Sequence, residues 1–318
     1  MEYTLVESIM GHISNIMTND TAVLAQTITQ HGSKQTYFTA RIMVDKDLKS
    51  DFFRSYAYFR WVDDVIDIHA QSDEERINFI ERQKNIIDGL FKNEFFEELT
   101  IEEQIIEDLI RNPRTEGSGL ESFIRNMFAI IEFDARRKGR LISRDELIWY
   151  TSKLGKSVTD GILYFVGNGH PYPINEYKYL AATAAHITHL LRDMLRDITD
   201  GFINIPREYL EENGIGPEHI DSYPFKSWVQ ERVVQAREYF RDGKIYLDEL
   251  DVLRSKIVGH WYCARFEGIL DAIERDGFIL RDKYPETQSS LAWFNFALIA
   301  LSVTIRHLAH RLSKVIRR

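Results

Sequence analysis

The sequence predicts an all-α protein, and three observations support this fold class. Apolar residues recur at three- and four-residue spacing instead of alternating, as they do along amphipathic helices. Only seven prolines occur in 318 residues and none precedes Pro113, so long stretches contain no strong helix breaker. Capping-box patterns at Ser72-x-x-Glu75 and Ser143-x-x-Glu146 mark the first residues of two helices.

The same periodicity predicts helices along nearly the whole chain. Turns are expected at 112–113, 167–173, 213–217 and 284–285, where glycine, asparagine and proline gather. The expected helices cover about 20–30, 50–70, 73–92, 100–111, 118–137, 144–167, 175–200, 227–242, 245–258, 260–276 and 287–316. No turn segment resembles a flexible linker and no internal repeat is visible. A single domain over 1–318 is therefore expected, in which 287–318 forms a C-terminal helix that is apolar and then basic.

The composition narrows the function classes. A chain that is 44% hydrophobic can bury a sizeable core, which excludes a disordered protein. Its 40 basic and 49 acidic residues argue against a nucleic-acid binder, which needs a positive surface. The single cysteine, Cys263, excludes an intrachain disulfide framework, a cysteine zinc site and an iron–sulfur cluster. It suits the reducing cytosol, and no secretory signal is visible in residues 1–20, so a cytoplasmic location is expected.

A first acidic cluster follows Tyr56 on the helix expected over residues 50–70. Asp63 and Asp67 are one helical turn apart and Arg60 lies one turn before them, while Asp64 lies between the two. Apolar residues surround these carboxylates, and burying a carboxylate is costly unless something neutralises it. Mg²⁺ is a natural counterion, because it takes oxygen ligands and shares them with substrate phosphates.

A second cluster lies on the helix expected over residues 175–200. His186, His189, Asp193 and Asp197 fall within a stripe of roughly 60° on a 3.6-residue helix, with Arg192 beside them. Two imidazoles and two carboxylates therefore line one ridge.

Each cluster alone has a simpler interpretation, since acidic helix turns are usually solvated and paired histidines usually belong to the core or surface. Two such turns, each within apolar sequence and next to an arginine, fit facing helices of a bundle. Facing carboxylate helices with several Mg²⁺ ions would bind a diphosphate and help it leave as pyrophosphate.

These motifs resemble those of the squalene/phytoene synthase family. The run from Tyr56 to Asp67 resembles the first aspartate-rich motif of that family, and Leu191 to Asp197, with Gly201 and Pro206 after it, resembles the second. Three further segments are similar in the same order: the serine-lysine segment 32–38, the tyrosine helix with Tyr150 and 155–158, and the C-terminal stretches 266–274 and 278–281. The ordered pair of aspartate motifs is the specific part of this resemblance.

The resemblance implies the class I isoprenoid synthase fold around a central apolar cavity. It also implies head-to-head condensation of two prenyl diphosphates, C15 or C20, through a cyclopropyl intermediate. The implied ligands of Mg²⁺, or of Mn²⁺ in its place, are Asp63, Asp64, Asp67, His189, Asp193 and Asp197. The implied diphosphate-binding residues are Ser33, Lys34, Arg60, Arg192 and Lys283. Tyr150 would lie beside the carbocation or act in proton transfer, and the sequence does not decide whether NADPH takes part.

The chain also departs from the family pattern and is therefore expected to be a divergent member. Histidines replace the usual glutamine and asparagine, an arginine replaces a glutamate, and three further positions differ: His186, His189, Arg196, Phe202, Asn204 and Phe266. Two other functions stay open, namely terpene-cyclase-type ionisation of a single prenyl diphosphate and a non-catalytic assembly factor of the same fold. Catalysis is favoured because all four principal aspartates are present.

The C-terminal segment permits two interpretations. Residues 291–305 are apolar nearly all round, and residues 306–318 contain five Lys/Arg and no acid. Fifteen apolar residues are short of the ~20 that span a bilayer. A last core helix with a basic end that complements its dipole is the simpler interpretation. The alternative is peripheral membrane contact, with basic groups at anionic headgroups.

Overall fold

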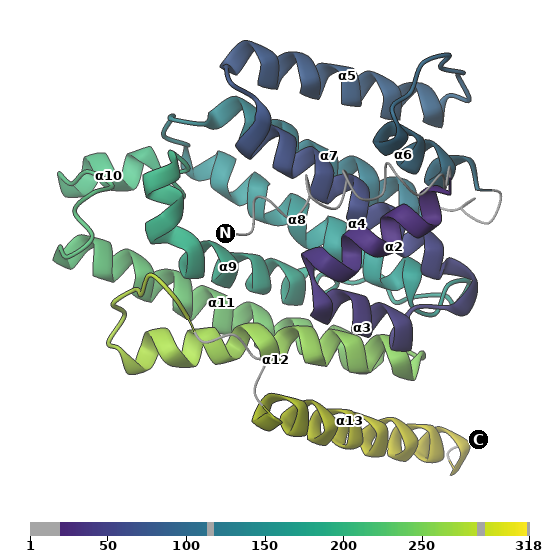
Figure 1. Cartoon of the computed structure of the whole chain (residues 1–318). Helices are drawn as coiled ribbons and strands as arrows, with labels where there is room; N and C mark the ends of the chain where they lie inside the picture. Colours follow the sequence, from purple (N-terminus) through teal and green to yellow (C-terminus); the bar gives the residue numbers. More distant parts are fainter. Residues whose placement is uncertain (1–19, 113–117, 285–289, 317–318) are drawn as a thin grey trace. The chain divides into compact units, whose positions relative to one another are not determined.

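The computed structural model describes residues 20–112, 118–284 and 290–316, and the chain divides into two compact units, 1–120 and 121–318 (Figure 1). Helices dominate both units. Within the described ranges, the β-type pairing is limited to an isolated bridge between Leu141 and Ile203. The predicted all-α class is confirmed, whereas the single domain over 1–318 stays a prediction. Residues 1–19, where no secretory signal was expected, lie outside the described residues. So do residues 287–289 of the helix expected over 287–316.

The first unit is built around helix α4. Its elements are α2 (Thr21–Gly32), α3 (Lys34–Met43), a 3₁₀ turn η1 (Lys46–Leu48), α4 (Lys49–Asp64), a π-helix η2 (Val65–His69), α5 (Asp73–Phe91) and α6 (Ile101–Arg111). Helices α2, α3 and α6 all pack against α4, which is why Ala57, Tyr58 and Val62 are completely buried. Helix α3 was not predicted.

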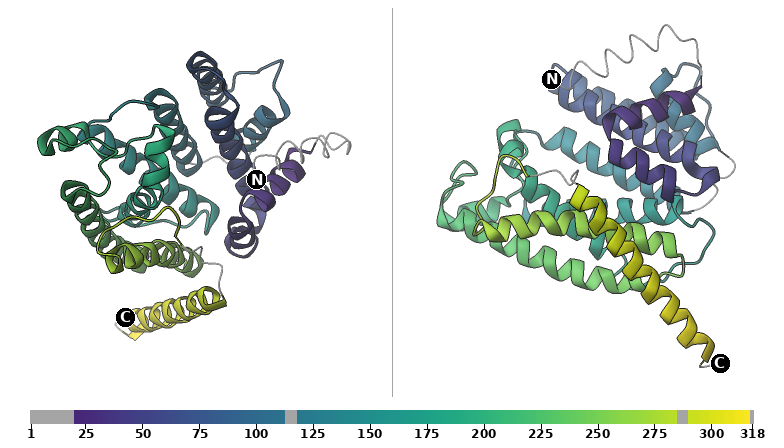
Figure 2. Two further views of the ribbon diagram at one scale, coloured as in Figure 1. Left: turned by 60° about the vertical axis from the view of Figure 1, so that its left-hand side comes forward. Right: turned by 60° about the horizontal axis from the view of Figure 1, so that its bottom comes forward.

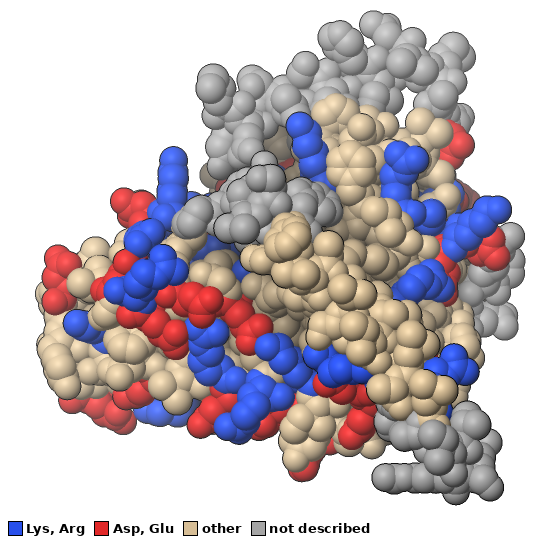
Figure 3. Space-filling view, turned by 90° about the horizontal axis from the view of Figure 1, so that it is seen from below, with Lys and Arg blue, Asp and Glu red and all other residues tan. Residues whose placement is uncertain are grey.

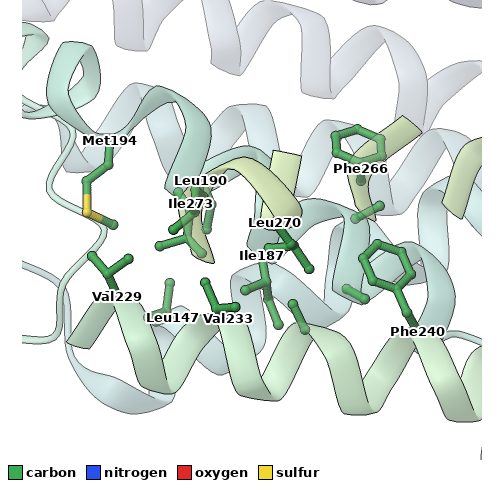
Figure 4. Packing of buried hydrophobic residues seen from close by; sticks show 14 of the residues in the cluster. Leu147, Ile187, Leu190, Met194, Val229, Val233, Phe240, Phe266, Leu270 and Ile273 are labelled. Atoms are coloured by element: carbon green, nitrogen blue, oxygen red, sulfur yellow. The ribbon is translucent and has the colours of Figure 1, made fainter. Parts of the chain in front are cut away.

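The second unit is built around helix α9. Its elements are α7 (Ser118–Arg137), which begins at the end of the first unit, α8 (Arg144–Phe165), α9 (Leu180–Asp200), α10 (Arg207–Asn213), α11 (Tyr223–Glu249), α12 (Leu253–Arg275) and α13 (Ser290–Ile316). Helices α8, α11 and α12 pack on α9. Apolar side chains from α9, α11 and α12 meet between them, among them Ile187, Met194, Val233 and Leu270 (Figure 4). Helix α13 packs on the outer side of α12 and crosses it obliquely (Figure 2, right-hand view).

Helix caps follow the sequence signals with one variation. The Ser143 hydroxyl accepts from the Glu146 amide while the Glu146 carboxylate accepts from the Ser143 amide, which completes the predicted capping box. Ser72 caps α5 in the same way, but the Glu75 carboxylate accepts from the Gln71 amide instead. None of the described helices combines the length and the apolar character that a membrane span requires.

The predicted boundaries around residues 242–260 are wrong. The sequence predicted breaks near Gly243 and Gly259, but both lie inside helices, and the chain turns at 250–252 between α11 and α12. Close packing explains the glycines. A Cβ on Gly243 would lie 2.3 Å from the backbone nitrogen of Ala181, and one on Gly259 would lie 2.5 Å from Leu247 Cδ2. Glycine is needed there for contact between helices and does not mark a helix end.

The Gly243 contact makes a stability prediction. Gly243→Ala should lower the free energy of unfolding by about 1–3 kcal/mol, because the added methyl group meets backbone that cannot move aside. Gly268→Ala on α12 is the matched control, because nothing lies within 4 Å of its Cβ position. It should raise stability by about 0.5–1 kcal/mol, as alanine does in an exposed helix. Urea unfolding of both variants measures the difference, and equal effects would contradict the packing account.

Candidate active site

The first aspartate motif lies where α4 widens into the π-helix η2. The amide of Ala70 donates to the carbonyl of Val65 at 2.9 Å, which closes the wide turn. Asp63 lies in the last turn of α4 and Asp67 in η2, and both are exposed. The helix predicted over 50–70 is therefore present, but its last turn is not the regular α-helix that was expected. Such wide turns occur frequently at functional sites.

Asp64 forms an internal ion pair with Arg60. The Arg60 guanidinium donates to Asp64 through Nε at 3.1 Å and lies within 2.9 Å of the second oxygen through Nη2. Burial opposes the charged guanidinium, but Asp64 outweighs burial and raises the pKa of Arg60. Asp64 is buried while Asp63 and Asp67 are exposed, so the three carboxylates do not share one environment. The ligand role predicted for Asp64 stays a prediction.

The predicted serine-lysine segment lies beside the same helix. Ser33 caps α3 by accepting from the Thr36 amide at 3.2 Å, and a side-chain hydrogen bond joins Ser33 to Tyr56 of α4. A Cβ on Gly32 would lie 3.2 Å from the Tyr56 hydroxyl, so the chain crosses this ring closely. Exposed Lys34 is the first residue of α3. A helix N-terminus with a serine and a lysine is a favourable place for an anion.

In the second unit, α9 carries the predicted ridge, and Asp193 contacts two arginines and a histidine. Arg192 donates to both oxygens of Asp193 at 2.8 and 2.6 Å, and His189 Nε2 lies 2.9 Å from the carboxylate. Arg196 approaches to 3.5 Å. Burial opposes ionisation, yet Arg192 and His189 hold the pKa of Asp193 below its usual range.

Asp197 lies one turn further and has the opposite character. Burial, followed by the charge of Asp193, raises the pKa of Asp197 to about 7. Asn204 donates to this carboxylate at 3.2 Å. Two neighbouring carboxylates, one of them poorly neutralised, make a place that attracts a further cation.

The carboxylates of both motifs fit Mg²⁺ by their chemistry. Each motif offers a pair of hard oxygen donors, Asp63 with Asp67 and Asp193 with Asp197. Over residues 20–112, 118–284 and 290–316, no group of three or more His, Cys, Asp or Glu side chains is placed to hold a metal ion. This is not the pattern of an all-protein cage. Mg²⁺ is usually bound through one or two carboxylates, with waters and substrate phosphates as the other ligands.

A buried polar cluster beside α9 was not foreseen as a unit. The Tyr150 hydroxyl of α8 donates to Asp134 of α7 at 2.7 Å, and Arg137 donates to the other oxygen of Asp134 at 2.6 Å. The Arg137 side chain is only 2% exposed, and its guanidinium lies 4.8 Å from the centre of the Tyr150 ring. Asp134 and Arg137 are three residues apart in an amphipathic helix, which was the available sequence signal.

The segment after α9 completes this cluster. Gly201 ends α9 with a positive φ of 89°, and its carbonyl accepts from the Gly139 amide at 2.8 Å. This pairing between the two turns places Phe202 over the Arg137 guanidinium at 5.5 Å. Phe202 and Asn204 were noted in the sequence as departures from the family pattern, and they contact Arg137 and Asp197 respectively.

Several buried polar atoms of the cluster have no hydrogen-bond partner among the described residues. They are both ring nitrogens of His186, Nη1 of Arg137 and Oδ1 of Asn204. The His186 ring lies 5.1 Å from that of Tyr150. Leaving such groups unpaired costs about 1–3 kcal/mol each, so a water or a polar ligand atom is expected here.

Two further basic residues could bind a diphosphate, Arg232 and Lys283. The sequence did not predict a role for Arg232 of α11. Burial lowers its pKa to about 10, and among the described residues no carboxylate forms an ion pair with it. Lys283 lies exposed in the irregular segment after α12, and its predicted role stays a prediction.

Phe266 is buried, 6.3 Å from the His189 ring and 5.1 Å from the Tyr262 ring.

Comparisons with known proteins agree with this description. The family model described as squalene/phytoene synthase matches residues 29–290. A curated relative, the bifunctional lycopene cyclase/phytoene synthase of Arthroderma gypseum, is 25% identical over 235 residues, or 66% of this chain. The matched part is 39% of that protein, so the chain spans about two fifths of the relative's length.

Solved structures show the same fold. Squalene synthase HpnC from Alicyclobacillus acidocaldarius is similar with a TM-score of 0.66 at 20% identity, covering 82% of this chain and 95% of that one. A dehydrosqualene synthase in complex with a ligand gives a TM-score of 0.59 at 12% identity, covering 89% and 95%. At these identities the likeness concerns the fold, and it confirms the all-α architecture predicted from the sequence.

The raised pKa of Asp197 predicts how stability depends on pH in metal-free buffer. The folded state keeps the proton up to about pH 7, whereas the unfolded chain loses it near 3.8. The unfolded state therefore binds fewer protons in this window, and this carboxyl should remove stability as pH rises from about 4 to about 7, by up to ~1.4 kcal/mol per pH unit.

Asp197→Asn should abolish that contribution. Urea unfolding in EDTA at pH 5 and pH 7 should show the variant gaining on the wild type as pH rises. Parallel pH profiles for the two proteins would contradict the assignment. Asp200→Asn, an exposed position on the same helix, serves as the control.

Proposed function

The chain belongs to the squalene/phytoene synthase family, a family of prenyltransferases, and on that premise we propose that it joins two prenyl diphosphates head to head. One observation carries the proposal: each of the two aspartate motifs keeps a carboxylate pair next to an arginine, Asp63/Asp67 with Arg60 and Asp193/Asp197 with Arg192.

Mg²⁺ is the proposed cofactor, and Mn²⁺ is a proposed substitute. When bound, it would neutralise diphosphate charge and stabilise the charge that develops on departing pyrophosphate. Asp63, Asp67, Asp193 and Asp197 would hold it, with Asp64 and His189 as further candidates. Because His189 and Arg192 both contact Asp193, they would also set how strongly that carboxylate attracts a cation.

The chain offers its own positive groups to the diphosphates. In the first unit these are the N-terminus of α3 with Ser33 and Lys34, and the exposed part of Arg60. In the second unit, Arg192 and Arg232 are the candidates, with Lys283 as a third. Arg232 has no carboxylate partner among the described side chains, so a phosphate group would supply the missing negative charge.

The proposed condensation needs a proton acceptor. The C1–O bond of one substrate breaks and its electron pair leaves with pyrophosphate. The double bond of the second substrate supplies the electrons of the new C–C bond, and a proton leaves as the cyclopropane closes. The Tyr150 hydroxyl is the proposed acceptor: as its oxygen takes this proton, its own proton passes to the Asp134 carboxylate, to which it already donates a hydrogen bond. Arg137 already lies over the Tyr150 ring, which favours this role over stabilisation of a carbocation by the ring face.

Product mass tests the reaction. The purified protein is incubated with farnesyl or geranylgeranyl diphosphate and Mg²⁺, with and without NADPH, and the organic extract is analysed by mass spectrometry. Doubling of the carbon count supports coupling and reports the chain length. A product with the carbon count of one substrate would indicate a terpene cyclase, and no pyrophosphate release would indicate an assembly factor. We also propose that the protein acts in the cytoplasm and binds no nucleic acid.

The carboxylate pairs make a direct prediction. Asp63→Ala and Asp193→Ala should each lower turnover by roughly 100-fold or more. Removing a residue that only hydrogen-bonds to a metal ligand already costs about 10–100-fold in activity, and removing the ligand itself should cost more. Their circular dichroism should match the wild type. Asp73→Asn, a change of a carboxylate that is 89% exposed, should keep full activity. Near-wild-type turnover in both alanine variants would overturn the proposed metal role.

His189 supplies a second test. His189→Asn restores the residue usual in the family, so activity with Mg²⁺ should be kept within about tenfold. If His189 is a ligand, the preference between Mg²⁺ and Mn²⁺ should shift, because imidazole suits softer metals. The activity ratio in the two metals measures this. Lost activity with unchanged metal affinity would instead indicate another role for the imidazole.

A further inference from the structure

Helix α13 uses one of its faces to pack against α12. The Trp261 indole of α12 donates to the carbonyl of Phe296 at 2.8 Å, and the two rings lie 5.8 Å apart. Val303 and His307 follow on α13 at helical spacing and are 1% and 7% exposed. The packing of this face on α12 agrees with the interpretation of the C-terminal segment as a last core helix.

The same helix carries a second apolar face that the described residues leave uncovered. Six large side chains recur at alternating spacings of four and three, and each is between 48% and 63% exposed: Phe294, Leu298, Leu301, Ile305, Leu308 and Leu312. We call this set the outer stripe. At 1.5 Å per residue it extends for about 27 Å. Figure 3 shows this face of the molecule, where a broad uncharged band follows α13.

The charge of this segment is opposite to that of the chain. Residues 290–318 contain five Lys/Arg and no Asp or Glu, although the whole chain has a formal charge of -9. Exposed Arg306 and Arg311 directly neighbour Ile305 and Leu312 of the outer stripe. Arg306 also lies 3.5 Å from Asp248, so its position beside the stripe is supported from α11.

We propose that the outer stripe of α13 docks in the plane of an anionic lipid surface. A helix with apolar residues on its free face and basic residues beside them binds such surfaces by burying the first and neutralising the second. Because the inner face is packed on α12, the helix lies along the surface. A second copy of the chain fits less well, since it would bring together two basic segments without any acid.

Lipid binding is read without turnover, so this inference stands or falls independently of the proposed reaction. The full-length protein is mixed with vesicles of phosphatidylcholine alone, or of equal parts phosphatidylcholine and phosphatidylglycerol, and then floated on a density gradient. We expect flotation with the phosphatidylglycerol vesicles, weakened by high salt. No flotation with those vesicles would overturn the proposal.

Matched variants distinguish lipid binding by the outer stripe from non-specific binding by other exposed apolar residues. Leu301→Ser/Ile305→Ser should lower the vesicle partition by at least about tenfold, because two exposed side chains lose their apolar contact with lipid. Val234→Ser/Ile245→Ser, at exposed positions of α11, should bind like the wild type. Arg306→Gln/Arg311→Gln should weaken binding to anionic vesicles by about tenfold.

Light scattering in solution tests whether a second copy of the chain covers the outer stripe instead. Both serine pairs are expected to match the wild type in mass and in thermal unfolding, since the changed residues are exposed. A wild-type dimer that Leu301→Ser/Ile305→Ser converts to a monomer, with unchanged flotation, would overturn the lipid assignment in favour of a second copy. Equal flotation of both serine pairs would also overturn it.

Discussion

The close approach of α9 to its neighbours determines how its polar residues are presented. A Cβ on Gly155 of α8 would lie 2.1 Å from the Thr183 hydroxyl, and one on Gly243 of α11 would lie 2.3 Å from the Ala181 nitrogen. The first half of α9 therefore has little freedom to rotate. Since a helix is rigid over a few turns, this contact also sets the direction in which Asp193 and Asp197 project from its second half.

Within that frame, two aspartates one turn apart have opposite pKa shifts, and their neighbours explain why. Burial raises the pKa of both carboxyls. At Asp193, Arg192 and His189 outweigh burial, whereas at Asp197 the charge of Asp193 adds to it and Asn204 contributes only an uncharged amide. The Asp197 end of the ridge therefore has less compensating positive charge than the Asp193 end, and the proposed Mg²⁺ would supply that charge there.

The sequence was informative where local spacing decides the structure. It predicted helices α4 and α9, the positions of Asp63 on α4 and of Asp193 and Asp197 on α9, and the Ser143 cap, since each depends on residues within a turn or two. It did not predict the contacts between Arg137 and Phe202 or between Asn204 and Asp197, because these depend on how the turn at 139–142 pairs with 201–207. The glycines of α11 and α12 were misleading for the same reason, since only tertiary packing distinguishes a contact glycine from a helix end.

The two faces of α13 place different packing constraints on substitution. Val303 and His307 are buried, so a substitution there must fit the packing around them. Substitutions at Leu301 or Ile305 meet no described internal neighbour, and random drift at such sites would soon introduce polar residues. Rates of change compared between the two faces among close relatives would therefore reveal whether selection maintains the outward leucines, without any biochemical assay.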